Sequence, residues 1–328
     1  MSQATATRTL TFSQAIREAL AEEMKRDDRV FVWGEDVAVY GGIYGATAGL
    51  LEEFGPERVI DTPISETMIV GAAVGAAITG LRPVAELQSS GYFGIAMDEL
   101  YHKVARWRYM HGGVFTVPLV IRLPEGAKGA GPEHDVSPEA LFLSASGAYV
   151  VIPSDPADAL GLMKSSIRDD NPVLFFEHAG LYAHRGEVPS GDHLVPLGQA
   201  AVKREGSDVT VIAWSRMVGE SLRAAEQLEA EEIDVEVVDP RGLRPLDLDT
   251  ILESVAKTGR VVIAHEAPKT GGAGGEVAAI IAEEALEYLE SPIIRVASAD
   301  VPIPQSRYLQ QFLIPTAASV TEAVRRLD

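Results

Sequence analysis

Residues 59–79 read VIDTPISETMIVGAAVGAAIT, and this stretch decides the fold class. The apolar pair Val59-Ile60 predicts a short strand that ends at Asp61, where Pro63 turns the chain. A helix rich in glycine and alanine is expected to start at Ser65 or Glu66. Open α/β sheets bind ligands at the carboxyl ends of their strands, so Glu66 is placed to meet one. A helix-capping role for Glu66 is the alternative.

The same alternation of strand and helix continues along the chain. Continuous apolar strands are predicted at 117–123 and 149–152, the pattern of a parallel sheet covered on both faces. A first amphipathic helix is expected over 11–25, with Ser13 as its N-cap. The fold class is therefore α/β, with two doubly wound domains, each a mostly parallel sheet flanked by helices.

With 328 residues, the chain is long enough for about two domains. An irregular stretch rich in glycine and proline predicts a linker between two regular regions. We expect a first domain over residues 1–185, a linker over 186–200 and a second domain over 201–328.

The composition excludes several classes of function. The net charge of -20 repels phosphate backbones, so nucleic acid is not an expected partner. The acidic surface could instead attract a basic protein module, or it could serve only solubility. The absence of cysteine excludes disulfides, thiolate metal sites and a cysteine nucleophile, and it fits the cytoplasm. No secretory signal and no apolar run of ~20 residues is present, so we expect a cytoplasmic protein without a membrane partner.

Residues 126–139, GAKGAGPEHDVSPE, predict a glycine-rich loop after a buried strand. The loop carries His134, which could act as a general acid or base because its ordinary pKa is near neutrality. An exposed histidine without a catalytic role is the alternative.

Two other segments could hold a charged ligand. Residues 270–276, TGGAGGE, imitate a phosphate-binding loop but match neither established fingerprint, so a tight turn is favoured. Residues 166–172, SIRDDNP, gather oxygen donors that suit a hard cation, although from the residues alone a solvated turn from helix to strand is the preferred interpretation.

Eight segments, in order and at matching spacing, resemble one known family over about Leu10 to Leu327. The family is the β subunit of the thiamine-diphosphate-dependent decarboxylating component of pyruvate, branched-chain 2-oxo acid and acetoin dehydrogenase complexes, related to the last two domains of transketolase. The segments are Gly34-Glu35-Asp36-Val37, Gly41-Gly42, Phe54-Gly55-x-x-Arg58-Val59, Asp61-Thr62-Pro63-Ile64-Ser65-Glu66, Gly80-Leu81-Arg82-Pro83-Val84, Arg108-Tyr109-x-x-Gly112-Gly113, Ile167-Arg168-Asp169 and Glu266-Ala267-Pro268-x-Thr270-Gly271-Gly272.

The resemblance implies roles for particular residues. Glu66 would hydrogen-bond N1′ of the cofactor's aminopyrimidine ring, and His134 would assist proton transfer as the acyl group passes to a lipoyl arm. The residues expected to line the aminopyrimidine pocket are Ile64, Gln88 and Tyr92. Many members bind a structural potassium ion, here expected at Leu119, Ser166, Asp169 and Asn171.

The resemblance also implies partners. Enzymes of this group hold the diphosphate and magnesium with a Gly-Asp-Gly motif, which this sequence lacks. An α subunit is therefore expected to hold both, in a heterotetramer of two α and two β chains. A dihydrolipoyl acyltransferase would dock through its subunit-binding module and present its lipoyl domain, and the substrate would be pyruvate or a branched-chain 2-oxo acid.

The sequence departs from the family at two places. His134 is followed by Asp135, where members usually have serine, and a carboxylate close to the imidazole would favour its protonated form. Ser89 or Ser90 replaces a usual aromatic residue, which suggests a roomier or more polar pocket. The alternatives are a split transketolase-like transferase, a divergent acetoin dehydrogenase β subunit and a non-catalytic assembly partner.

Overall fold

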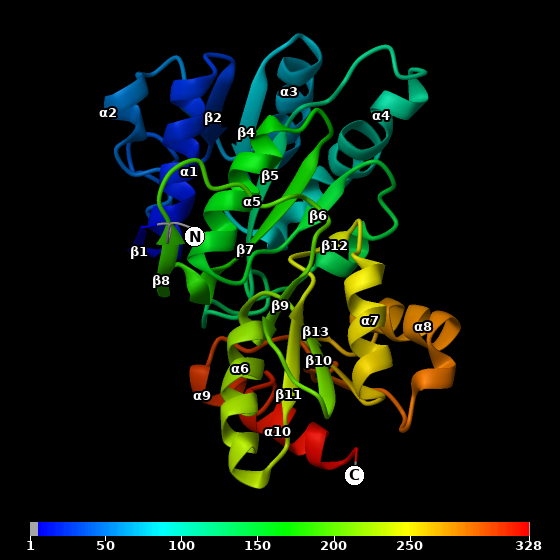
Figure 1. The fold of residues 1–328 in the computed structure, drawn as a ribbon. Helices are drawn as coiled ribbons and strands as arrows, with labels where there is room; N and C mark the ends of the chain where they lie inside the picture. Colours follow the sequence, from blue (N-terminus) through cyan, green and yellow to red (C-terminus); the bar gives the residue numbers. More distant parts are fainter. Residues whose placement is uncertain (1–5, 328) are drawn as a thin grey trace. The chain divides into compact units, whose positions relative to one another are not determined.

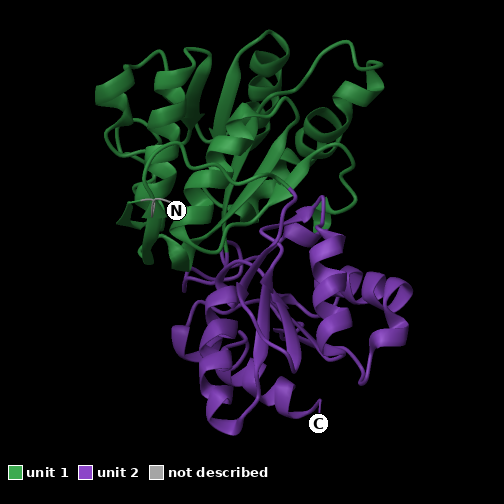
Figure 2. Ribbon diagram, viewed as in Figure 1, with its two compact units in different colours: residues 1–125, 141–197 green, residues 126–140, 198–328 purple. Residues whose placement is uncertain are grey.

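The computed structural model describes residues 6–327, which form two compact α/β units (Figure 2). Unit 1 runs to Glu125 and resumes over Leu141–Leu197. Unit 2 consists of Gly126–Ala140 and the chain from Gly198 onward. The expected α/β class with mostly parallel sheets is confirmed in both units.

Six parallel strands form the sheet of unit 1, in the order β6-β7-β5-β4-β2-β3. Two further strands, β1 and β8, form a separate antiparallel pair. Gly34 at the end of β2 pairs with Asp61 of β3 and with Glu86 of β4, so these three strands end at one edge. The bounds are β1 Thr7–Thr11, β2 Val30–Gly34, β3 Val59–Asp61, β4 Arg82–Glu86, β5 Val120–Glu125, β6 Tyr149–Val151, β7 Val173–His178 and β8 Arg185–Pro189.

The helices of unit 1 cover the sheet, and α1 packs beside α5 (Figure 1). The first helix begins after Thr11, which forms a capping box with Gln14. The prediction that Ser13 is the N-cap is therefore wrong. The hydroxyl of Ser13 donates instead to the carbonyl of Tyr44, at 2.7 Å. The bounds are α1 Phe12–Arg26, α2 Leu50–Phe54, α3 Glu66–Ile78, α4 Ala105–Met110 and α5 Pro156–Arg168, with 3₁₀ turns at Ser90–Ala96, Glu139–Phe142 and Ala179–Leu181 and a π-helical turn at Glu99–Val104.

A buried ionic network ties three strands of this sheet together. Arg122 of β5 donates from Nε and Nη2 to the two carboxylate oxygens of Glu177, each at 2.7 Å, and from Nη1 to Glu86. Tyr182 donates to the same carboxylate of Glu177 at 2.7 Å. One cation thus serves two buried carboxylates, and burial raises the pKa of Glu86.

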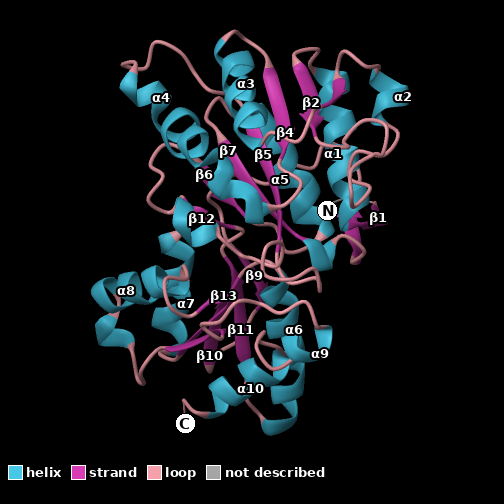
Figure 3. Cartoon of the chain, turned by 180° about the vertical axis from the view of Figure 1, so that it is seen from behind, coloured by secondary structure: helices cyan, strands magenta, loops and turns pink. Residues whose placement is uncertain are grey.

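Unit 2 has a five-stranded sheet in the order β14-β13-β10-β11-β9, parallel except for β9. Helices α6 and α10 pack on one face, and α7 and α8 cover the other (Figures 1 and 3). The bounds are β9 Ala201–Arg204, β10 Val209–Ala213, β11 Val235–Asp239, β12 Gly242–Arg244, β13 Val261–Pro268, β14 Ile294–Ser298, α6 Arg216–Leu228, α7 Leu248–Thr258, α8 Gly274–Glu284, α9 Arg307–Gln310 and α10 Ala317–Arg325, with 3₁₀ turns at Glu229–Glu231 and Leu286–Tyr288.

Candidate active site

The carboxyl ends of β2 and β3 are joined by the side chain of Asp61. Its carboxylate accepts hydrogen bonds from the backbone amides of Ala38, at 2.7 Å, and Val39, at 3.1 Å. The amide of Thr62 donates to the carbonyl of Gly34 at 2.9 Å. These bonds fix the turn from β3 into α3, and with it the first residue of that helix, Glu66.

Glu66 is a buried carboxylate, 9% exposed, at the head of α3. Within the described part of the chain, no group donates a hydrogen bond to it. Glu35 lies close by, and its pKa is raised by partial burial and by the negative charges of Asp36 and Glu66. Among the described residues, the oxygens of Glu66 do not belong to the fully buried polar atoms that lack a partner, so the carboxylate is open to a ligand at the head of α3.

Three further expected pocket residues belong to the same unit as Glu66. Gln88 lies two residues after the end of β4. Its side-chain amide donates to Asp36 at 3.5 Å, so it reaches the same acidic cluster. Tyr92 is half-buried in a 3₁₀ turn, and Ile64 is 74% exposed in the turn before α3. The structure therefore brings Gln88 and Glu66 to the pair formed by Glu35 and Asp36.

Ser89 and Ser90, which replace the usual aromatic residue, are both buried. The hydroxyl of Ser89 accepts a hydrogen bond from the amide of Gly91 at 3.3 Å and caps the 3₁₀ turn that carries Tyr92. Ser90 is fully buried. Both serines pack in the interior of unit 1, and their effect on pocket size stays a prediction.

His134 is half-buried and belongs to unit 2, in the loop Gly126–Ala140. Its amide donates to the carbonyl of Gly131 at 3.0 Å, and Lys128 Nζ donates to its carbonyl at 3.2 Å. The carboxylate of Asp135 accepts hydrogen bonds from loop amides and from Gln310. Asp135 thus organises the loop.

A buried polar cluster that sequence reasoning missed anchors both ends of this loop in unit 2. At one end, the amide of Ala127 donates to Glu266 of β13 at 2.6 Å. At the other end, Trp214 Nε1 donates to Glu139 at 3.2 Å, and the indole stacks on His265 with ring centroids 5.1 Å apart. Sequence spacing gives no signal for this cluster, because its members come from separate strands.

Burial shifts the pKa values of two members of this cluster, Glu139 and His265, in opposite directions. Removal from water raises the pKa of Glu139 to about 7, and the nearby charge of Glu266 adds to the effect. Burial lowers the pKa of His265 to about 4, and the positive charge of Arg295 adds to that shift. Both groups are therefore mostly neutral just below pH 7.

The position of His265 explains why the 270–276 segment is rich in glycine. A Cβ at Gly272 or at Gly274 would lie 2.5 or 2.6 Å from the His265 ring, so only glycine leaves room for it. Gly271 also has a φ of +74°, which favours glycine. These two constraints support the tight turn expected from the sequence.

The residues expected to bind potassium surround one turn of unit 1. Ser166 lies in the last turn of α5, Asp169 is its C-cap, and Asn171 leads into β7. Leu119 and Ser166 line the same narrow gap beside Arg82. Asp169 Oδ1 already accepts from the backbone and side-chain nitrogens of Asn171, at 2.7 and 2.9 Å.

Arg82 supplies positive charge to the same turn. Its Nη1 donates to the carbonyls of Ile167, at 2.9 Å, and Asp169, at 2.8 Å. Over residues 6–327, no group of three or more His, Cys, Asp or Glu side chains could hold a metal ion. Any cation at this turn would have to use mainly neutral carbonyl and amide oxygens, which suits a monovalent ion better than a divalent one.

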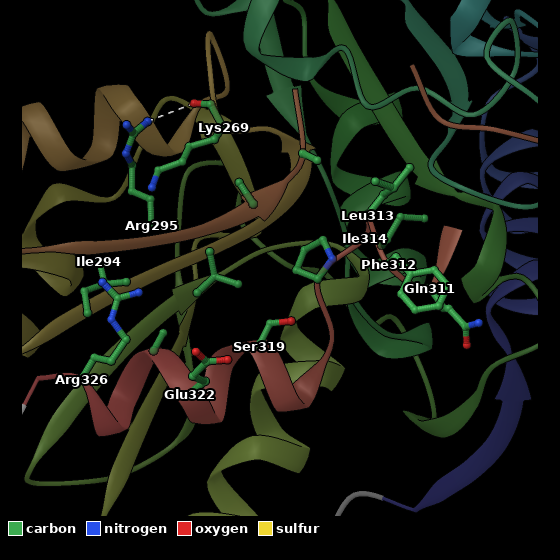
Figure 4. A pocket seen from close by; sticks show the side chains of 15 residues that line it. Lys269, Ile294, Arg295, Gln311, Phe312, Leu313, Ile314, Ser319, Glu322 and Arg326 are labelled. Atoms are coloured by element: carbon green, nitrogen blue, oxygen red, sulfur yellow. Dashed lines mark hydrogen bonds between the residues drawn. The ribbon is translucent and has the colours of Figure 1, made fainter. Parts of the chain in front are cut away.

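A hollow of about 400 Å³ opens in unit 2 between β14 and α10 (Figure 4). Lys269, Arg295 and Arg326 line it together with Glu322 and Ser319. Arg295 Nη1 donates to the carbonyl of Lys269 at 3.1 Å, whereas Arg326 projects from α10 (Figure 4). The hollow lies beside the edge strand β14, and among the described residues none from the His134 loop lines it.

Separately from these sites, no helix in the described 6–327 range is long and apolar enough to cross a membrane.

Comparison with known proteins defines the class first. The family profile "Transketolase, pyrimidine binding domain" matches residues 8–184, and "Transketolase, C-terminal domain" matches residues 198–320. The fold is therefore that of a transketolase-type domain pair, and the pyrimidine-binding domain implies thiamine diphosphate.

The relatives narrow this class. The pyruvate dehydrogenase E1 component subunit beta of Bacillus subtilis is 46% identical over 320 residues, and the 2-oxoisovalerate dehydrogenase subunit beta of the same organism is 44% identical over 321; each match covers 97% of this chain and 98% of the relative. The chain belongs to the family of E1 β subunits of pyruvate and branched-chain 2-oxo acid dehydrogenase complexes. Membership implies an E1 α partner.

A solved structure confirms the fold. The chain matches a protein described as "Split gene transketolase, inactive beta4 tetramer" with a TM-score of 0.81, at 28% identity, over 97% of this chain and 98% of that one. The identity to this structure is lower than the 44% and 46% identities to the two dehydrogenase β subunits.

We predict that Glu139→Gln changes how stability depends on pH. In the folded chain Glu139 keeps its proton up to about pH 7, whereas in the unfolded chain it loses it near its ordinary value of 4.5. The wild-type free energy of unfolding should therefore fall between those two pH values, by up to roughly 3 kcal/mol, and level off above them.

Glutamine cannot titrate, so the variant should gain stability relative to wild type on going from pH 5 to pH 8. Urea unfolding at both pH values measures this difference, with the exposed Glu133→Gln of the same loop as the control. An equal difference between variant and wild type at both pH values would contradict the assignment.

Proposed function

We propose that this chain supplies the aminopyrimidine-binding half of the active site of a 2-oxo acid dehydrogenase. The enzyme would decarboxylate pyruvate or a branched-chain 2-oxo acid oxidatively and transfer the acyl group to a lipoyl domain. The observation that carries the proposal is Glu66, a largely buried residue at the carboxyl edge of a parallel sheet whose carboxylate accepts no hydrogen bond from the described residues.

Glu66 fits the role of holding a proton at N1′ of the aminopyrimidine ring. From Gly71 onward α3 consists mainly of small residues, which let neighbouring groups approach the helix closely, and burial strengthens a hydrogen bond made at Glu66. When bound, thiamine diphosphate supplies the electron sink that lets carbon dioxide leave. Ile64, Gln88 and Tyr92 would line the ring from the same unit.

His134 would move a proton when the acyl group passes to the lipoyl thiol. His134 is half-buried, and histidine is the side chain best suited to both accept and donate a proton in the physiological pH range. The fixed backbone around it supports a defined starting position for the ring.

The α subunit would hold the diphosphate and magnesium, in a heterotetramer of two α and two β chains. The absence of a Gly-Asp-Gly motif from this sequence supports this division of labour. The net charge of -20 would favour docking of a basic subunit-binding module from the acyltransferase. The related split transketolase is described as inactive when it forms a tetramer of β chains, so activity has to be measured with α present.

Two assignments within the family stay open to experiment. The identities to the pyruvate and 2-oxoisovalerate enzymes differ by two percentage points, 46% against 44%, and thus do not select the substrate. Assays of the complex on pyruvate, 3-methyl-2-oxobutanoate and acetoin select between them and test the acetoin alternative.

Glu66→Gln should lower dye-linked decarboxylation by the αβ complex by about 100-fold or more, because a neutral amide cannot hold the proton at N1′. Assembly with α, measured by size-exclusion chromatography, should not change. The exposed Glu52→Gln makes the same charge change in α2 and should keep full activity. Normal turnover by an assembled Glu66→Gln complex would refute the proposed role.

His134→Ala should reduce acyl transfer to a lipoyl domain more than it reduces decarboxylation with a dye acceptor. The imidazole is needed as a proton donor mainly in the transfer step, where a loss of about 100-fold is expected. The exposed His184→Ala provides a matched control. Equal losses in both half-reactions would argue against this division of roles.

We further propose a potassium ion at the turn formed by Leu119, Ser166, Asp169 and Asn171. Potassium salts should raise the midpoint of thermal unfolding above that in choline salts at equal ionic strength, because a ligand of the folded state stabilises it. Asn171→Ala should remove the difference between the two salts. The same midpoint in both salts for the wild type would exclude the site.

A further inference from the structure

The loop Gly126–Ala140 folds around the carboxylate of Asp135. Four successive backbone amides donate to it: Lys128 to Oδ1 at 3.2 Å, and Gly129, Ala130 and Gly131 to Oδ2 at 3.0, 3.0 and 3.2 Å. Successive amides that converge in this way form a concave site for an anion. Here the anion is a side chain of the same loop.

The backbone shape that makes this possible depends on glycine. Gly129 and Gly131 have φ values of +83° and +98°, which other residues rarely adopt. A Cβ at Gly129 would also lie 2.8 Å from Arg307 Nε. The glycines therefore serve the folding of the loop around Asp135.

A second segment of unit 2 completes the site. Gln310 Nε2 donates to Asp135 Oδ2 at 2.7 Å and to the carbonyl of Pro304 at 2.7 Å. Arg307, also in α9, donates to the carbonyl of Lys128 at 3.1 Å. The segment around α9 thus holds both the carboxylate and the backbone that surrounds it.

The carboxylate of Asp135 is buried and depends on the loop amides for its hydrogen bonds. The residue is 2% exposed, and a buried carboxylate is stable only when hydrogen bonds replace water. The two oxygens of Asp135 accept hydrogen bonds from four backbone amides and from Gln310, whereas a single hydroxyl oxygen accepts about two. The serine usual in the family cannot replace all these bonds, so aspartate here has a structural reason.

His134 is the direct neighbour of Asp135 and shares its turn. The amides of His134 and Asp135 both donate to the carbonyl of Gly131, at 3.0 and 2.8 Å. The turn that Asp135 closes therefore fixes the backbone from which the imidazole projects.

We infer that Asp135, held by the loop amides and by Gln310, is a positioning residue for His134 in acyl transfer. The inference rests on the proposed function of His134. Loss of the carboxylate should let the loop open and should misplace the imidazole, while the pyrimidine-binding unit that carries Glu66 keeps its structure.

The experiment uses Asp135→Asn in the αβ complex, which keeps the size of the side chain and removes its charge. The value of kcat for acyl transfer should fall about tenfold or more, because small misplacements of a reacting group are costly. The KM for the lipoyl domain and the rate of dye-linked decarboxylation should stay within a factor of about three. The exposed neighbour Glu133→Gln should match wild type.

Trypsin provides a readout that does not depend on activity. Lys128 is the one lysine or arginine between residues 126 and 140, so cleavage after it reports loop opening. Asp135→Asn should be cut there several-fold faster than wild type and Glu133→Gln. Gln310→Ala, which removes one donor and no charge, should give a smaller change in the same direction.

The outcomes separate this inference from the proposed role of His134. Faster cleavage and lower kcat in Asp135→Asn support the inference. Unchanged cleavage and unchanged kcat in an assembled Asp135→Asn complex overturn it, even when His134→Ala is impaired. If His134→Ala transfers acyl groups normally, the proposed function of His134 fails and the inference falls with it. If Asp135→Asn does not assemble, the Gln310→Ala result decides in the same way.

Discussion

The parallel pairing of β2 with its two neighbours is the constraint on which the pyrimidine-binding unit depends. Gly34 pairs with Asp61 on one side and with Glu86 on the other, so three strands end together. A Cβ at Gly34 would lie 2.7 Å from the carbonyl oxygen of Glu86, which leaves space only for glycine. Because the strands end there, Glu35, Asp36 and Glu66 gather at one edge, where a ligand can reach them.

The buried carboxylates of Glu86 and Glu177 in the interior of this unit have a cationic partner, whereas the carboxylate of Glu66 at the edge of the sheet has no donor among the described residues. In the interior, Arg122 compensates Glu177 and Glu86 with a set of hydrogen bonds, as buried charges require. At the edge, Glu66 is nearly as well buried but receives no donor from the described residues. This contrast indicates that the first pair stabilises the fold, whereas Glu66 is kept available for a ligand.

The loop of residues 126–140 illustrates a different way of making a site. It is organised by polar groups at three points: Ala127 on Glu266, Asp135 on its own amides and Gln310, and Glu139 on Trp214. Such hydrogen bonds are directional, so they define the backbone around His134 more narrowly than packing would. The loop thereby belongs to the second unit although it follows a strand of the first.

The sequence by itself determined the α/β class, a start of α3 at Ser65 or Glu66, and the family, because strand and helix periods and local turn residues are short-range signals. It also marked Glu66 and His134 as candidates. It placed the first helix cap at Ser13 rather than Thr11, since either hydroxyl suits a cap and only the contact with Tyr44 distinguishes them. Tertiary structure alone decided the role of Asp135, the neutral Glu139 and the glycines against His265, because these depend on burial and on partners far apart in the chain.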